Sequence, residues 1–127
     1  MKKNEVIAKL NEMKNRNKRM SAWEKGVYEY AFDILEPLDD GLDYGNYQTL
    51  LNGASSWTQY SRGGCALICD DDIAKRMCTP SEYKRYLNSG DNSKYNKDMY
   101  FIDNVQVRGL YQAMAKIRSA CRYINAE

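Results

Sequence analysis

The chain has 127 residues, of which 43% are hydrophobic and 28% are charged. This composition lies near the globular average and excludes a disordered chain, and the length suits one domain that buries a core. We therefore predict a single domain over residues 1–127, with a basic N-terminal helix over 1–20 and a main helical core over 21–127. No apolar run approaches the ~18 residues of a membrane-spanning helix, and the N-terminus lacks the apolar block of a signal peptide. Both features indicate a cytoplasmic protein without membrane contact.

The sequence contains no histidine and four cysteines. The lack of histidine excludes Ser-His and Cys-His catalysis and most general-base designs, so the sequence favours a protein that is not an enzyme. The cysteines stand at positions 65, 69, 78 and 121, a spacing that matches no common zinc module. We interpret them as small buried apolar residues and expect no metal and no cofactor.

Two amphipathic helices are expected in the first third of the chain. Apolar residues recur every three or four positions near the N-terminus, at Val6, Ile7, Leu10 and Met13. After a polar interval, Ser21 and Glu24 have the spacing of a capping box, which predicts a helix from about 22 to 35 that Pro37 closes. Its expected buried side consists of Trp23, Val27, Tyr30, Ala31, Ile34 and Leu35.

The middle of the chain alternates turns with short elements. Residues 38–45 are rich in turn-forming residues, and 46–52 predict a short helix closed by Gly53. The apolar run at 65–69 fits either a short strand or the start of a helix, and Asp70 is suited to cap a helix over 71–78. Thr79 and Glu82 form a second capping box, with Pro80 at the first helical position, and predict a helix over 80–87. A polar loop is expected over 88–97.

The C-terminal segment has the clearest helical pattern. Apolar residues follow one another at steps of three and four, at Val107, Leu110, Met114, Ile117, Cys121 and Ile124. This spacing predicts a helix of about 20 residues that begins near Asp103. The alternative is a hairpin over 99–107. Gly109 makes this alternative more plausible, because glycine weakens a helix by ~1 kcal/mol relative to alanine. The predicted fold is thus mainly α, a compact single-domain helical bundle, with a minor two-stranded β element as the alternative.

Charge is unevenly distributed along the chain. Residues 1–25 hold eight Lys or Arg against three acids, residues 26–72 hold one against nine, and residues 73–127 hold ten against five. Opposite segments can neutralise one another on folding, or they can leave a charged face that docks a partner. The sequence alone leaves both readings open.

Residues 52–65, NGASSWTQYSRGGC, gather aromatic, amide, guanidinium and glycine groups in one expected loop. Adjacent glycines can aim backbone N–H groups at an anion, and Arg beside aromatic rings is typical of stacking pockets and interface hot spots. The plainer interpretation is a tight turn whose rings cover the core. The first interpretation gives a candidate binding site that consists of Trp57, Gln59, Tyr60, Arg62, Gly63 and Gly64, with Asp70 and Asp71 at its flank. The acidic run at 70–72 suits a helix start better than a metal, because neighbouring helical residues point about 100° apart.

A nucleic-acid surface is a second candidate. The bases that could contact phosphates are Lys2, Lys3, Lys9, Lys14, Arg16, Lys18, Arg19, Arg108, Lys116, Arg118 and Arg122. A sequence pI near 8.3 lies below the >9 that is typical of committed nucleic-acid binders. The apolar seam of the C-terminal segment, formed by the residues from Val107 to Ile124 that recur at steps of three and four, also allows a homodimer. Burial inside one domain explains this pattern equally well.

The run SSWTQYSRGGCALICDDDIAKRMCTPSE at 55–82, followed by VRGLYQA at 107–113, resembles a group of small accessory proteins of bacterial phages and mobile elements. The resemblance covers the chain from Ser21 onward and carries over no catalytic or binding residue. It implies a protein that acts by binding a host protein or nucleoprotein complex, for example as an anti-CRISPR-like inhibitor of host defence. Two alternatives are a sponge for a small nucleotide signal and a helical DNA-binding regulator.

Overall fold

The computed structural model describes residues 1–54, 75, 78–88 and 97–126, and in 97–107 it describes the backbone. The helices are α1 Lys3–Arg16, α2 Ala22–Leu35, α3 Tyr47–Gly53, α6 Pro80–Asn88 and α7 Lys97–Ala126. The mainly helical fold is therefore as predicted. Over the described ranges no strand occurs, and a single isolated β-bridge joins Lys2 to Asp43. None of the described helices is both long and apolar enough to cross a membrane.

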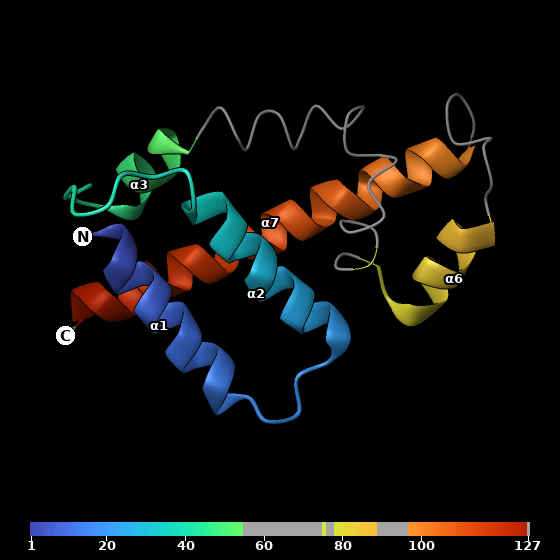
Figure 1. The fold of residues 1–127 in the computed structure, drawn as a ribbon, viewed down its shortest axis with the longest axis horizontal. Helices are drawn as coiled ribbons and strands as arrows, with labels where there is room; N and C mark the ends of the chain where they lie inside the picture. Colours follow the sequence, from blue (N-terminus) through green and yellow to red (C-terminus); the bar gives the residue numbers. More distant parts are fainter. Residues whose placement is uncertain (55–74, 76–77, 89–96, 127) are drawn as a thin grey trace.

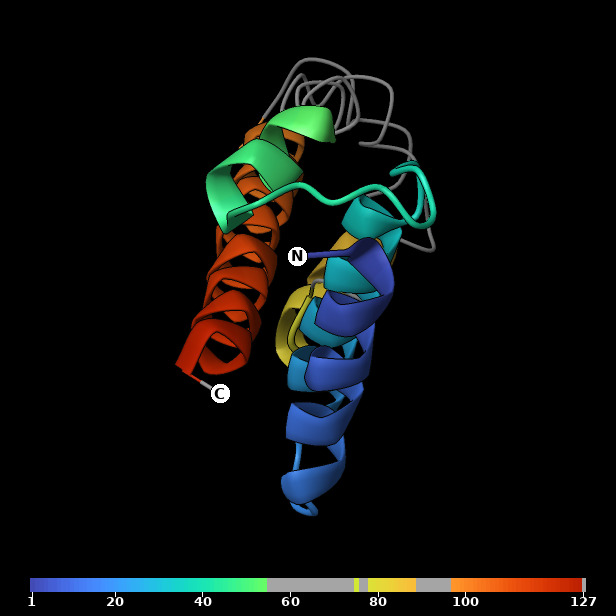
Figure 2. The same ribbon diagram turned by 90° about the vertical axis from the view of Figure 1, so that its left-hand side faces the viewer.

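Helices α1 and α2 form an antiparallel pair that packs across one side of α7 (Figure 1). Figure 2 shows the pair on one side and α7 on the other, with α3 beside α7. The core lies between these helices, and its largest fully buried side chains are Leu10, Tyr30, Ile34, Leu35, Leu50, Leu110 and Ile117. Full burial of one such side chain stabilises the fold by ~1.5–3 kcal/mol, so this interface holds the helices together.

Capping explains where two of the helices begin. Ser21 Oγ accepts from the backbone N–H of Glu24 at 3.1 Å, as predicted for the start of α2. The Glu24 carboxylate, however, accepts from the Asn17 side chain at 3.1 Å and does not complete the expected box. At the start of α6 the box is complete, because Thr79 Oγ1 accepts from Glu82 N and Glu82 Oε1 accepts from Thr79 N at 2.9 Å.

The connection between α2 and α3 is tied to the N-terminus. The α-ammonium of Met1 pairs with Asp43, and Met1 O accepts from Tyr44 N at 2.8 Å. Gly41 and Gly45 have φ of 79° and 76°, which confirms the predicted turn over 38–45. Gly53 is the last residue of α3 and does not have a left-handed φ, so it does not close the helix in the predicted way. A Cβ on Gly53 would lie 2.9 Å from Leu38 Cδ2, and glycine lets α3 approach this connection closely.

Helix α7 differs most from its prediction. It begins at Lys97, six residues before the expected start near Asp103, and it runs without a break through the stretch considered for a hairpin. The hairpin alternative is therefore wrong. The apolar seam is confirmed where side chains are described, since Leu110, Ile117 and Cys121 are buried against the α1–α2 pair. Packing within the chain accounts for this seam without a second copy.

Candidate functional site

The residues of the predicted binding loop lie outside the described ranges. This applies to Trp57, Gln59, Tyr60, Arg62, Gly63, Gly64, Asp70 and Asp71. It also applies to the apolar run at 65–69 and to most of the helix expected over 71–78. The loop hypothesis stays a prediction, and a candidate site can be built only from the second set of residues, the bases.

Lys3 is the clearest correction among the bases expected to contact phosphate. Only 8% of the residue is exposed, and its ammonium donates to the carbonyl oxygens of Leu38 at 2.8 Å and Glu36 at 3.2 Å. It also pairs with Asp40 Oδ1 at 2.8 Å, and the hydrogen bond to Asp40 raises the pKa of Lys3 above its ordinary value. Lys3 thus holds α1 to the chain that leaves α2 and is not available to a partner.

The other bases of α1 also interact within the chain. Lys9 Nζ lies 3.3 Å from Glu12 Oε2 and 5.7 Å from the centre of the Tyr123 ring on α7. Arg16 pairs with the same Glu12 one helical turn away, and Lys14 Nζ lies 5.9 Å from the centre of the Phe32 ring. Lys9, Lys14 and Arg16 therefore each have a contact partner within the chain. Lys18 and Arg19 are exposed in the connection from α1 to α2.

The bases of α7 fall into two groups. Arg108 Nη2 donates to both carboxylate oxygens of Glu82 of α6, at 2.8 and 2.9 Å, and Lys116 Nζ lies 5.4 Å from the centre of the Tyr28 ring. Burial by itself raises the pKa of Glu82, but the hydrogen bonds from Arg108 and Thr79 outweigh burial and hold that pKa below 4.5. Arg118 and Arg122, in contrast, have no ion pair with any carboxylate in the part of the chain described here.

The exposed bases of α7 lie on one side of the helix. Arg108, Tyr111, Ala115, Arg118 and Arg122 are all exposed and follow one another at steps of three, four, three and four residues. That spacing places them along one helix face, opposite the buried Leu110, Ala113, Ile117 and Ala120. We call these five residues the outer stripe of α7.

Helix α3 borders the outer stripe. The Arg118 guanidinium carbon lies 5.3 Å from the centre of the Tyr47 ring, close enough for a cation–π contact. Tyr47 itself packs against the core, so its ring is a fixed support for Arg118. Arg and Tyr on an exposed face are the residue types enriched in interface hot spots. The stripe is the candidate functional site.

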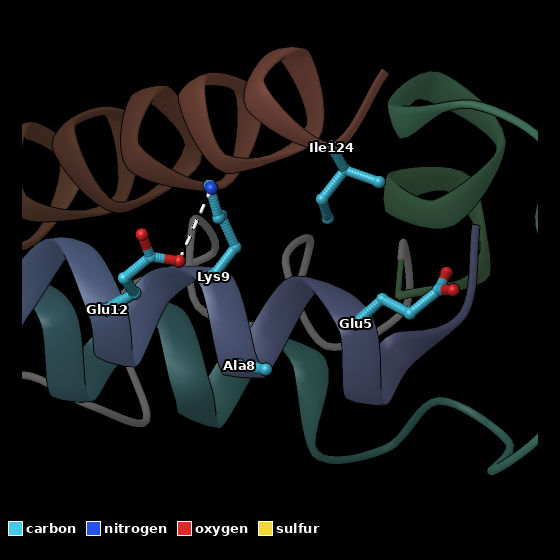
Figure 3. A pocket seen from close by; sticks show the side chains of 5 residues that line it. All are labelled: Glu5, Ala8, Lys9, Glu12 and Ile124. Atoms are coloured by element: carbon cyan, nitrogen blue, oxygen red, sulfur yellow. Dashed lines mark ion pairs between the residues drawn. The ribbon is translucent and has the colours of Figure 1, made fainter. Parts of the chain in front are cut away.

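A shallow polar pocket of ≈ 270 Å³ lies between α1 and the C-terminal part of α7 (Figure 3). It is lined by Glu5, Ala8, Lys9, Glu12 and Ile124, and Figure 3 shows the Lys9 ammonium beside the Glu12 carboxylate. Pockets for small organic ligands are mostly apolar, with a few converging polar groups. This pocket has two carboxylates and one ammonium, and the ammonium is bound to one of the carboxylates. It therefore does not favour the small-ligand alternative.

The two described cysteines are buried. Burial raises the pKa of Cys78 and of Cys121 from the ordinary 9.0 to about 11. Because a thiolate is the reactive form, neither thiol is suited to act as a nucleophile at neutral pH. Among residues 1–54, 75, 78–88 and 97–126, no group of three or more His, Cys, Asp or Glu side chains is placed to hold a metal ion.

Comparison with known proteins adds no family to this description. No family model, no curated protein and no solved structure matches the chain. The candidate site therefore depends on the geometry and charge of the outer stripe. The sequence contained a signal for it that the sequence analysis did not use: residues 104–126 hold four bases and no acid.

Proposed function

We propose that this chain is a non-enzymatic accessory protein of a phage or mobile element that binds and modulates a host protein or nucleoprotein complex. The observation that carries the proposal is the outer stripe of α7. Its Arg118 and Arg122 have no ion-pair partner in the described part of the chain, and Tyr111 is 54% exposed on the same face. A helix face of this composition suits a partner that carries negative charge.

Two features support binding without catalysis. The sequence has no histidine, which removes the commonest general base. The thiols of Cys78 and Cys121 are buried and have raised pKa values, so they do not supply a nucleophile either. An anti-CRISPR-like inhibitor of host defence is one form of such a protein, and the resemblance to phage accessory proteins supports that form.

The proposal is tested by parallel pull-downs from untreated and nuclease-treated lysate of the host bacterium. The bait is the wild type beside Arg118→Gln/Arg122→Gln, which removes two charges from the stripe and keeps helix propensity. A matched control, Lys25→Gln/Lys84→Gln, removes two exposed charges from α2 and α6. Circular dichroism establishes that all three baits are equally helical.

We expect one stoichiometric protein that the wild type and the control retain and the stripe variant loses. Retention of the same protein by all three baits would show that the stripe is not the contact surface. Arg62→Ala in the same assay tests the predicted loop separately, because Arg62 lies outside the stripe. If no bait retains a protein from either lysate, the proposed function fails.

A further inference from the structure

The part of α7 that carries the outer stripe has positive charge that no acid of the same stretch balances. In α1, bases alternate with acids, and Glu12 pairs with both Lys9 and Arg16. In α7, residues 104–126 contain four bases and no acid, and Glu82 of α6 neutralises only Arg108. Bases in the last turn of a helix are stabilised by the helix dipole, and the effect is confined to that turn. The last turn of α7 contains no base, so this interaction does not account for the presence of Arg118 and Arg122.

The arginines of the outer stripe are spread over a length that several phosphates of a nucleic-acid strand would occupy. At ~1.5 Å per residue, Arg118 and Arg122 are separated by ~6 Å along the helix, and Arg108 and Arg122 by ~21 Å. Each strand of B-form DNA carries a phosphate about every 3.4 Å along the helix axis, so on that scale the stripe is as long as about six phosphates. A row of guanidinium groups on this scale is suited to bind successive phosphates, and guanidinium is the preferred partner for phosphate among side chains.

The aromatic residues favour a single strand over a duplex. Tyr111 lies on the stripe between Arg108 and Arg118 and is 54% exposed, and the Tyr47 ring supports Arg118 from α3. Exposed aromatic rings beside Lys or Arg side chains are typical of single-strand sites, because unpaired nucleobases can stack on the rings. The nucleobases of a duplex are already stacked on one another and gain little from an exposed tyrosine.

We infer that the outer stripe of α7 binds single-stranded nucleic acid, with Arg118 and Arg122 on the phosphates and Tyr111 stacked on a base. This inference deepens the proposed function, on which it rests, by assigning the stripe to the nucleic-acid component of a nucleoprotein complex. Binding through phosphates and one stacked ring is independent of base sequence.

The test is fluorescence polarisation with a labelled oligothymidylate of about 12 nucleotides, a length typical of single-strand sites. We expect saturable binding at about 50 mM salt that weakens steeply towards about 200 mM salt, with a log–log slope of about −0.7 for each phosphate contact. Arg118→Gln/Arg122→Gln should weaken binding about tenfold or more and reduce the slope by about 1.4, the share of two contacts. The control Lys25→Gln/Lys84→Gln should bind as the wild type does.

Tyr111 is tested with two variants. Tyr111→Ala should weaken binding about fivefold or more, whereas Tyr111→Phe keeps the ring and should bind within about twofold of the wild type. Both variants are first checked for wild-type helicity by circular dichroism. Equal weakening by alanine and phenylalanine would show that the ring does not stack.

Three results would overturn the inference: no binding at low salt, equal weakening in the control variant, or equal affinity for a duplex of the same length. The failure of the inference is distinguishable from that of the proposed function. If the oligonucleotide does not bind but the pull-down still retains a protein that the stripe variant loses, the stripe contacts an acidic protein surface. In that case the proposed function stands and the nucleic-acid assignment is wrong.

Discussion

The buried and the exposed side of α7 differ in how strongly packing within the chain constrains their residue types. The inner side consists of Leu110, Ala113, Ile117 and Ala120, which are buried against α1 and α2. In the outer stripe, Arg108 contacts α6 and Arg118 contacts α3, and all five residues are exposed. Packing constrains the size and shape of every inner residue, whereas exposed positions of a helix tolerate most residue types. The composition of the outer side therefore carries information about a partner, and that of the inner side carries information about the fold.

Truncation of a large inner residue should have the largest effect. Ile117 is fully buried, and Ile117→Ala removes buried methyl groups and leaves a cavity that the helices fill only in part. We expect a loss of about 2–5 kcal/mol in the free energy of unfolding, measured by urea denaturation. A loss below about 1 kcal/mol would mean that the α7 interface with α1 and α2 is loosely packed.

A matched pair of alanines compares the two sides directly. Ala113 is fully buried, and Ala115, two residues later on the same helix, is exposed. Ala113→Leu should destabilise the fold by about 1–3 kcal/mol because the added atoms have no space. Ala115→Leu should change the free energy of unfolding by less than about 0.5 kcal/mol. Equal effects in thermal melts would contradict the assignment of the two sides.

The smallest effect is expected where the stripe meets α6. Glu82→Gln removes the charge that pairs with Arg108 but keeps an oxygen for the Thr79 N–H, so the helix cap is preserved. Because this pair is partly exposed, we expect a loss of about 0.2–1 kcal/mol at neutral pH. The variant also leaves Arg108 without its partner, and oligonucleotide binding by the stripe should become stronger.

The pH dependence of this effect has a definite sign. The pKa of Glu82 in the folded protein lies below 4.5, so the pair stabilises the fold above pH 4.5. Its contribution is lost as the pH falls through the pKa of the folded state. Melting temperatures of the wild type and of Glu82→Gln, measured from pH 7 downward, should therefore differ at neutral pH and converge below pH 4.5. A constant difference would show that the ionised carboxylate is not what stabilises the contact.

Local patterns predicted several elements well because short-range interactions decide them. Helix α2 occupies the predicted range, Ala22–Leu35, since its cap residue Ser21 and its apolar period agree. The start of α7 was misplaced because the segment at 103–106 resembles a capping box. Such residues are also tolerated inside a helix that continues on the N-terminal side, and no Pro or Gly interrupts 97–108.

The candidate site was less predictable than the fold. Eleven bases are equivalent candidates in the sequence, but Lys3 is buried and Arg108 is paired with a residue 26 positions earlier. A side chain is available to a partner only if no distant group of the same chain has bound it. Such neighbours are brought together by the packing of helices and do not appear in any local pattern.

The sequence by itself determined that the chain is helical, where α2 and α6 begin, and which side of α7 is apolar, because periodicity and capping act over a few residues. Only the tertiary structure decided which bases are engaged within the chain. Lys3, Lys9 and Arg108 interact with groups that the fold brings close to them, which for Lys9 is the Tyr123 ring, and Arg118 and Arg122 remain on the exposed side of α7. The reason is that the availability of a charge depends on contacts between segments far apart in the sequence.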